Sequence, residues 1–160
     1  MLVRFIKNSP SDATDMLTCV FTDGTNTSMP MARQGVLPHE AFHFVVEQTL
    51  GWRDAFFGQV SRGTRLAEVT AKLHDAKIDR AKNTQAIQSE AIVECLQTEQ
   101  WGGPVDPAGF ALNLVTSCRR RGVPPPDITA DELAAVRNAL REFGAAWRPL
   151  LPFSALERTF

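Results

Sequence analysis

The residues best suited to chemistry lie in one short segment, where the chain has the pattern H-E-x-x-H from His39 to His43. Two histidines four positions apart lie about one turn apart on one face of a helix, so their imidazole nitrogens can bind a single zinc ion or another divalent metal. In metalloproteases with this motif, the glutamate between them is the general base for a metal-bound water. The pattern predicts His39 and His43 as metal ligands and Glu40 as a catalytic base.

A third ligand is needed, and the sequence offers several. Glu47 shares the helix with the two histidines and is placed with them in the predicted metal set. It lies two turns from His39, about 12 Å along the axis, so one straight helix does not easily bring all three to one ion. Candidates elsewhere in the chain are His74, Glu90 and Glu94. No H-x-x-G-x-x-H extension follows the motif, which argues against one class of metalloprotease.

An interpretation without a metal is also open. His39, His43 and Glu47 could form a hydrogen-bonded row at a helix–sheet boundary, with His43 and Glu47 paired at positions i and i+4. The chain would then be a non-catalytic binding or structural protein, and the aromatic segment from Trp52 to Phe57 could be a surface for a partner. Whether the protein is an enzyme stays open at this stage. If it is one, metal-assisted hydrolysis is the predicted reaction.

The element that must position these residues is a helix over about residues 38–50. Pro38 suits the first helical position, and Gly51 suits the position after the end. At about 100° per residue, the two histidines and two glutamates form a polar stripe beside an apolar half. That apolar half consists of Ala41, Phe42, Val45 and Val46. The stripe therefore borders the core, where a half-buried site would lie.

The remaining pattern predicts an α+β fold, with a small antiparallel sheet packed with about four helices in a single domain over residues 1–160. Strands are predicted over 3–6 (as an edge strand), 16–21 and 27–29, and residues 155–160 could add a last strand beside the first or form a docked terminus. Residues 52–58 are predicted as an aromatic loop that covers the core. Further helices are predicted over 64–100, 107–121 and 130–147, with a break or solvated section within the polar residues 75–85. Thr129 and Glu132 form a capping box before the last of these helices.

Composition excludes several classes of protein. The 160 residues are 44% hydrophobic and 22% charged, with a formal net charge of −1, so the overall charge does not favour binding to nucleic acid. No apolar run approaches the roughly 20 residues that cross a bilayer, and residues 1–7 do not have the pattern of a signal peptide. An odd number of widely spaced cysteines predicts free thiols in a reducing compartment. We therefore expect a cytoplasmic protein without a membrane or nucleic-acid partner, which could assemble with itself or with another protein.

The segment over about residues 35–58 resembles a family of small, uncharacterised bacterial proteins. Members have a pattern similar to L-P-H-[DE]-x-x-H-[FY]-x-V-E, then L-G, then F-[FY]-G. The residues that carry the resemblance are Leu37, Pro38, His39, Glu40, His43, Phe44, Val46, Glu47, Leu50, Gly51, Phe56, Phe57 and Gly58. The family usually has Asp at the position of Glu40, and a shorter carboxylate would not reach a metal-bound water in the same way. The resemblance thus weakens the peptidase interpretation and leaves His39, His43 and Glu47 as the shared polar set.

Overall fold

The N-terminal meander that the sequence predicts forms one antiparallel sheet with a strand from residues 155–160, for which the sequence left a strand and a docked terminus open. The computed structural model describes residues 1–33 and 35–160. Its strands are β1 (Leu2–Ile6), β2 (Thr14–Val20), β3 (Asn26–Ala32) and β4 (Ala155–Thr159), in the order β3-β2-β1-β4. The prediction of an edge position for the first strand is wrong. The C-terminal tail pairs along its free side from Leu2↔Thr159 to Ile6↔Ala155, which makes β1 an inner strand.

Six helices occur in the described part of the chain, two more than predicted. They are α1 (His39–Thr49), α2 (Phe56–Ser61), α3 (Leu66–Leu73), α4 (Thr84–Gly102), α5 (Pro107–Arg121) and α6 (Ala130–Trp147). The predicted helix over 64–100 is interrupted between α3 and α4, within the polar section where a break was expected. A helix there would have had little apolar surface to pack against the core. The α+β class is confirmed.

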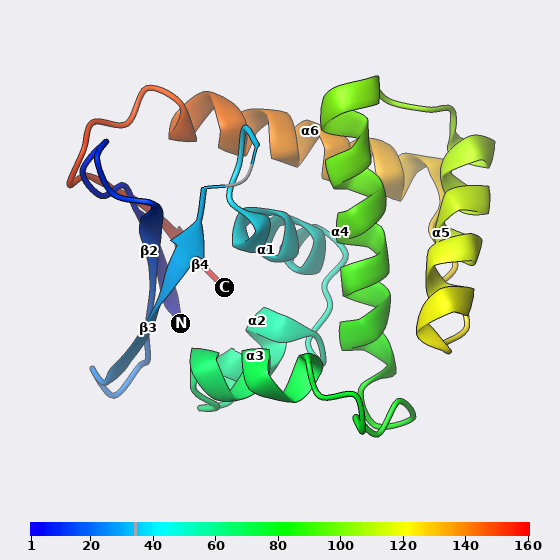
Figure 1. Cartoon of the computed structure of the whole chain (residues 1–160), viewed down its shortest axis with the longest axis horizontal. Coiled ribbons are helices and arrows are strands. Elements are labelled where there is room, and N and C mark those ends of the chain that lie inside the picture. The colour runs from blue at the N-terminus through cyan, green and yellow to red at the C-terminus, as the bar shows by residue number, and fades with distance from the viewer. Residues whose placement is uncertain (34) are drawn as a thin grey trace.

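Figure 1 shows α1 at the centre of the molecule, between the sheet and α4, with α6 crossing one end and α2 and α3 at the other. α5 packs on the far side of α4 from α1. The inner face of the sheet carries the Phe5 ring, which lies 5.7 Å from the ring of Phe44 in α1 and 5.0 Å from that of Phe143 in α6. The sheet and α6 thus hold α1 in place from one side.

The central position of α1 has a direct consequence for its polar residues. Every residue from Ala41 to Glu47 is buried. The stripe that the sequence places at the border of the core is covered by α4 and α2, so His43 and Glu47 lie in the interior. Polar groups buried in this way must find partners within the protein.

Two further sequence expectations bear on the surroundings of the site. All three cysteines (Cys19, Cys95 and Cys118) are free and buried, as expected. Among residues 1–33 and 35–160, no helix combines the length and the apolar character needed to cross a membrane.

Candidate metal centre

Two imidazoles of α1 and one carboxylate of α4 converge between these helices. His39 Nε2 and His43 Nε2 lie 3.1 Å apart. Glu90 of α4 reaches toward both, with Oε1 3.3 Å from His43 Nε2 and Oε2 3.6 Å from His39 Nε2. Around a tetrahedral ion with bonds of about 2.1 Å, ligand atoms lie about 3.4 Å from each other. The three spacings bracket that value.

The other nitrogen of each imidazole has its own partner. His39 Nδ1 lies 3.3 Å from Gln97 Oε1, and His43 Nδ1 lies 3.1 Å from Ser89 Oγ. An amide oxygen can only accept a hydrogen bond, so the proton of neutral His39 belongs on Nδ1. In metal sites a hydrogen bond of this kind fixes the ring and directs the Nε2 lone pair at the ion.

The convergence of acceptors has an electrostatic consequence. With protons on both Nδ1 atoms, two Nε2 lone pairs and a carboxylate face one another at distances of 3.1 to 3.6 Å, and none of these atoms is a donor. Such a cluster repels itself unless a cation, either a proton or a metal ion, lies among the acceptor atoms. Burial by itself lowers the pKa of His43, but the nearby Glu90 and Glu47 carboxylates outweigh burial and raise it. The site is thus built to hold positive charge.

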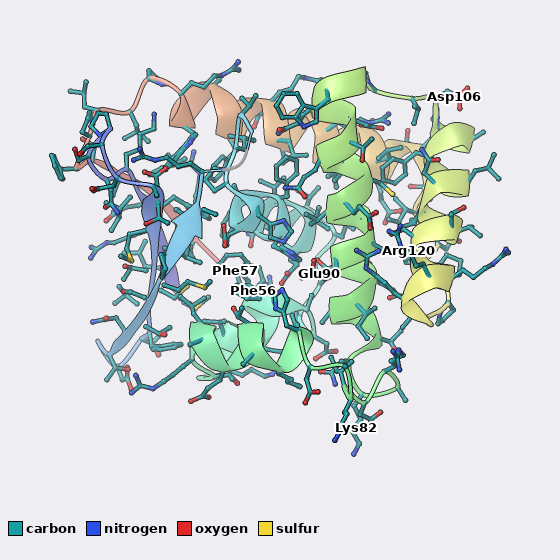
Figure 2. The ribbon with its side chains drawn as sticks, in the orientation of Figure 1. Phe56, Phe57, Lys82, Glu90, Asp106 and Arg120 are labelled. Atoms are coloured by element: carbon teal, nitrogen blue, oxygen red, sulfur yellow. The ribbon has the colours of Figure 1, made fainter. Side chains whose placement is uncertain are left out.

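The two histidines in turn affect the pKa of the Glu90 carboxylate. Its side chain is 28% exposed, and Figure 2 shows it in the space between α4 and α2, the helix that carries Phe56 and Phe57. Burial alone would raise the pKa of Glu90, but the two histidines hold it below its usual range. The residue therefore carries a negative charge toward the histidines. Sequence analysis names Glu90 among the candidates for a third ligand, and the structure brings it to the pair.

Glu47, by contrast, does not belong to this group of three. Its fully buried carboxylate accepts hydrogen bonds from the backbone N–H groups of Phe56 at 3.0 Å, Phe57 at 2.8 Å and Gly58 at 3.2 Å. These are the free donors at the start of α2, whose own N-cap residue, Ala55, makes no side-chain hydrogen bond. Glu47 thus caps α2, while Oε1 stays 3.5 Å from His43 Nδ1.

The cap explains a further difference from the sequence prediction. Residues 52–58 are predicted to form an aromatic loop, whereas α2 begins at Phe56 and has no side-chain cap from Ala55. The acceptor comes instead from Glu47 in the preceding helix. A side chain at Gly58 would collide with the backbone carbonyl of Arg53, so the first turn of α2 requires glycine.

A small cavity of about 60 Å³ adjoins the cluster. Glu40 lines it together with the three cluster residues, and Glu40 Oε2 is buried without a hydrogen-bond partner in the described part of the chain. Burial raises the pKa of Glu40. The space accommodates one or two water molecules but not a peptide. A water there would have Glu40 and the cluster as polar neighbours.

The two other candidate ligands have different roles. His74 lines the same cavity, but it is exposed and its Nδ1 lies 2.8 Å from the Thr70 carbonyl oxygen. Glu94 is paired with Arg120 and Arg121 of α5. Sequence analysis missed Ser89 and Gln97, although Gln97 lies seven positions after Glu90 and so on the same helix face.

Comparisons with protein-family models, with curated proteins and with solved structures find no match. The resemblance of residues 35–58 to a family of small bacterial proteins stays a prediction.

Proposed function

We propose that this protein binds one divalent metal ion, with zinc as the simplest choice, through His39 Nε2, His43 Nε2 and a carboxylate oxygen of Glu90. The observation that carries the proposal is the convergence of two Nε2 atoms, 3.1 Å apart, on the Glu90 carboxylate, whose Oε1 lies 3.3 Å from His43 Nε2 and whose Oε2 lies 3.6 Å from His39 Nε2. Two histidines and one glutamate are a known ligand set of catalytic zinc sites, in which a water occupies the fourth position. The adjoining cavity offers room for that water.

The chemistry that this arrangement supports is hydrolysis of a small substrate. A bound metal lowers the pKa of its water toward about 7. Glu40 Oε2, which lacks a partner among the described residues, would accept the proton of that water. The water oxygen would then bond to an electrophilic carbon, and the leaving group would take the proton as its own bond to that carbon breaks. The size of the cavity argues against a peptide chain as substrate.

The second candidate is a structural role without a metal. It is favoured by the same distances, because 3.1 Å between two imidazole nitrogens also suits a hydrogen bond when one ring is protonated. In that case a proton would supply the positive charge that the three acceptors need. The protein would then have a binding or structural function, and the cluster would serve packing alone.

Metal analysis of the untagged protein separates the two candidates. We expect about one equivalent of zinc or manganese per chain in the parent, and none in the His39→Ala/His43→Ala variant. His74→Ala is the matched control, because it removes the third histidine of the chain and should leave the metal content unchanged. Absence of metal from the parent, even after incubation with zinc or manganese, would overturn the metal proposal in favour of the structural role.

A further inference from the structure

A second and larger cavity lies between α4, α6 and the segment that precedes α1. Its volume is about 330 Å³, within the range of small-molecule sites. Four apolar side chains, of which three are almost fully buried, contribute to its wall: Leu37, Phe42, Leu96 and Leu140. Phe42 lines this cavity, whereas His39 and His43 of the same helix line the smaller one. The two cavities thus use different faces of α1.

The polar part of the wall is unusually basic for a chain whose net charge is −1. Arg137, Arg141 and Arg148 of α6 and its C-cap line the cavity with one carboxylate, Glu99. Arg137 is occupied, because it pairs with Glu99 and donates to the Val105 carbonyl oxygen at 2.8 Å.

Arg141 and Arg148 are exposed and have no carboxylate partner in the described part of the chain. Each makes one hydrogen bond to a neutral acceptor: Arg141 donates to Asn138 Oδ1, and Arg148 Nε donates to the Gly144 carbonyl oxygen at 3.1 Å. Two positive charges therefore remain without a counter-ion at the edge of an apolar cavity.

On the side of α6 that lines the cavity, the residue between these two arginines is Gly144. Arg141, Gly144 and Arg148 lie at positions i, i+3 and i+7 and so share one side of α6. The nearest atoms to a side chain at Gly144 would be Arg148 Nη2 and Leu37 Cδ2, both at 3.8 Å, so packing does not require glycine. Glycine destabilises a helix interior relative to alanine. Its effect here is to keep the cavity open between the two guanidinium groups that have no carboxylate partner among the described residues.

We propose that this cavity binds a small organic anion with an apolar body, such as a medium-chain carboxylate. The carboxylate lies between Arg141 and Arg148, where charge-assisted hydrogen bonds can form. The hydrocarbon part packs on the apolar wall around Phe42 and Leu96. The choice of occupant follows from charge complementarity together with the volume. The proposal does not depend on the metal centre.

Calorimetric titration of the full chain at low salt tests the proposal, with sodium octanoate as the probe and octanamide as a neutral probe of the same length. We expect saturable binding of octanoate, and binding of octanamide that is weaker by about tenfold or more. Arg141→Gln/Arg148→Gln should reduce octanoate affinity by about the same factor. Arg65→Gln/Arg119→Gln is the matched control, because these exposed arginines do not line the cavity and the same charge is lost.

A variant that fills the cavity tests the contribution of its volume to binding separately from that of the arginine charges. Gly144→Met projects a flexible side chain between Arg148 and Leu37 and should abolish octanoate binding. Its melting temperature should not fall, because methionine is a better helix former than glycine. A variant that unfolds at lower temperature would be replaced by Gly144→Ala, for which partial weakening is expected.

Four outcomes would overturn the proposal. They are no saturable octanoate binding, equal affinity for octanamide, an equal loss in the control variant, and unchanged octanoate binding in a folded Gly144→Met protein. A fifth outcome would also replace it. If sedimentation shows a dimer that Arg141→Gln/Arg148→Gln dissociates, a second copy of the chain occupies this surface.

Discussion

Two glutamates one turn apart on α4 meet very different partners. Glu90 faces the histidines of α1, with carboxylate-to-nitrogen distances of 3.3 and 3.6 Å. Glu94 faces α5, where it pairs with Arg120 and with Arg121 at 2.5 Å and accepts a hydrogen bond from Ser117 Oγ at 2.9 Å. Figure 2 shows Arg120 between α5 and α4 and Glu90 on the other side of α4. A glutamate of α4 thus takes part in each of these helix–helix contacts. We call the contact of Glu90 with His39 and His43 the α1–α4 seam, and that of Glu94 with Arg120 and Arg121 the α4–α5 seam.

The partners of the two glutamates differ in whether they can lose a proton. Arginine stays protonated at all relevant pH values and has no lone pair, so the α4–α5 seam is a complete ion pair. Histidine can lose its proton and then offers a lone pair to a metal. The α1–α4 seam therefore collects acceptors that need a cation, and it is also more deeply buried. Of these two glutamates only Glu90 is a candidate metal ligand, because its histidine partners can offer lone pairs to the same ion and the arginine partners of Glu94 cannot.

The largest expected effect is on folding stability, and it compares Glu47, the buried cap of α2 beside the α1–α4 seam, with Glu94 in the α4–α5 seam. Glu47→Ala leaves three buried N–H groups of α2 without an acceptor, and we expect it to lower the free energy of unfolding by about 3–5 kcal/mol. Glu94→Ala removes a half-exposed ion pair and should cost less than about 1 kcal/mol. Urea unfolding followed by circular dichroism measures both values. Gln48→Ala, at an exposed neighbour in α1, is the matched control, and similar losses for Glu47 and Glu94 would contradict the comparison.

Metal affinity should separate the two glutamates of α4 directly. Glu90→Gln replaces a charged ligand by an amide and should weaken zinc binding by at least about 100-fold. Glu94→Gln, one turn away, should leave the affinity unchanged, because its side chain faces α5. Competition with a chromogenic chelator gives both dissociation constants. Equal losses in the two variants would mean that the overall charge of α4, and not the geometry around Glu90, governs binding.

A smaller effect is expected from the groups that orient the imidazoles. Ser89→Ala removes the partner of His43 Nδ1, and Gln97→Ala removes that of His39 Nδ1. Each change should weaken zinc binding by about tenfold, because the ring is no longer held with its Nε2 toward Glu90. The same chelator competition measures the effect. Thr98→Ala, at an exposed position beside Gln97, is the control, and an affinity equal to that of the parent in both test variants would show that ring orientation does not matter.

Sequence analysis succeeds where the determinants are local. The helix over 107–121 was predicted with the observed bounds, because Pro107 and Gly122 mark its ends. The capping box of Thr129 and Glu132 is present at the start of α6. The β1–β2–β3 meander also follows from strand patterns that adjoin one another in the chain, whereas the pairing of β4 with β1 joins residues 155–159 to residues 2–6.

The remaining features depend on long-range packing. α2 begins where it does because Glu47 supplies an acceptor from nine residues before Phe56. The spacing in the sequence does not distinguish Glu90 from Glu94 as a candidate third ligand, since both can lie toward one side of α4. The position of α4 between α1 and α5 decides which of the two meets the histidines. That position follows from the folding of the whole chain, which no local pattern encodes.

The smallest expected effect is the pH dependence of the α4–α5 seam. Burial alone would raise the pKa of Glu94, but hydrogen bonds from Arg120, Arg121 and Ser117 lower it to about 2, from an ordinary value of 4.5. The unfolded chain therefore binds this proton first, so the contribution of Glu94 to stability is fully present above about pH 4.5 and is lost as the pH falls toward 2. The side chain is 39% exposed, and solvent screening limits the contribution to less than about 1 kcal/mol.

Urea unfolding between about pH 6 and pH 3 tests this sign, because the parent should lose slightly more stability with acid than Glu94→Gln. Glu142→Gln, at an exposed position in α6, is the control and should follow the parent. Added salt should shrink the difference, since ions screen half-exposed pairs. If Glu94→Gln loses as much stability with acid as the parent, the α4–α5 seam is not a complete ion pair in solution, and the contrast with the α1–α4 seam would rest on burial alone.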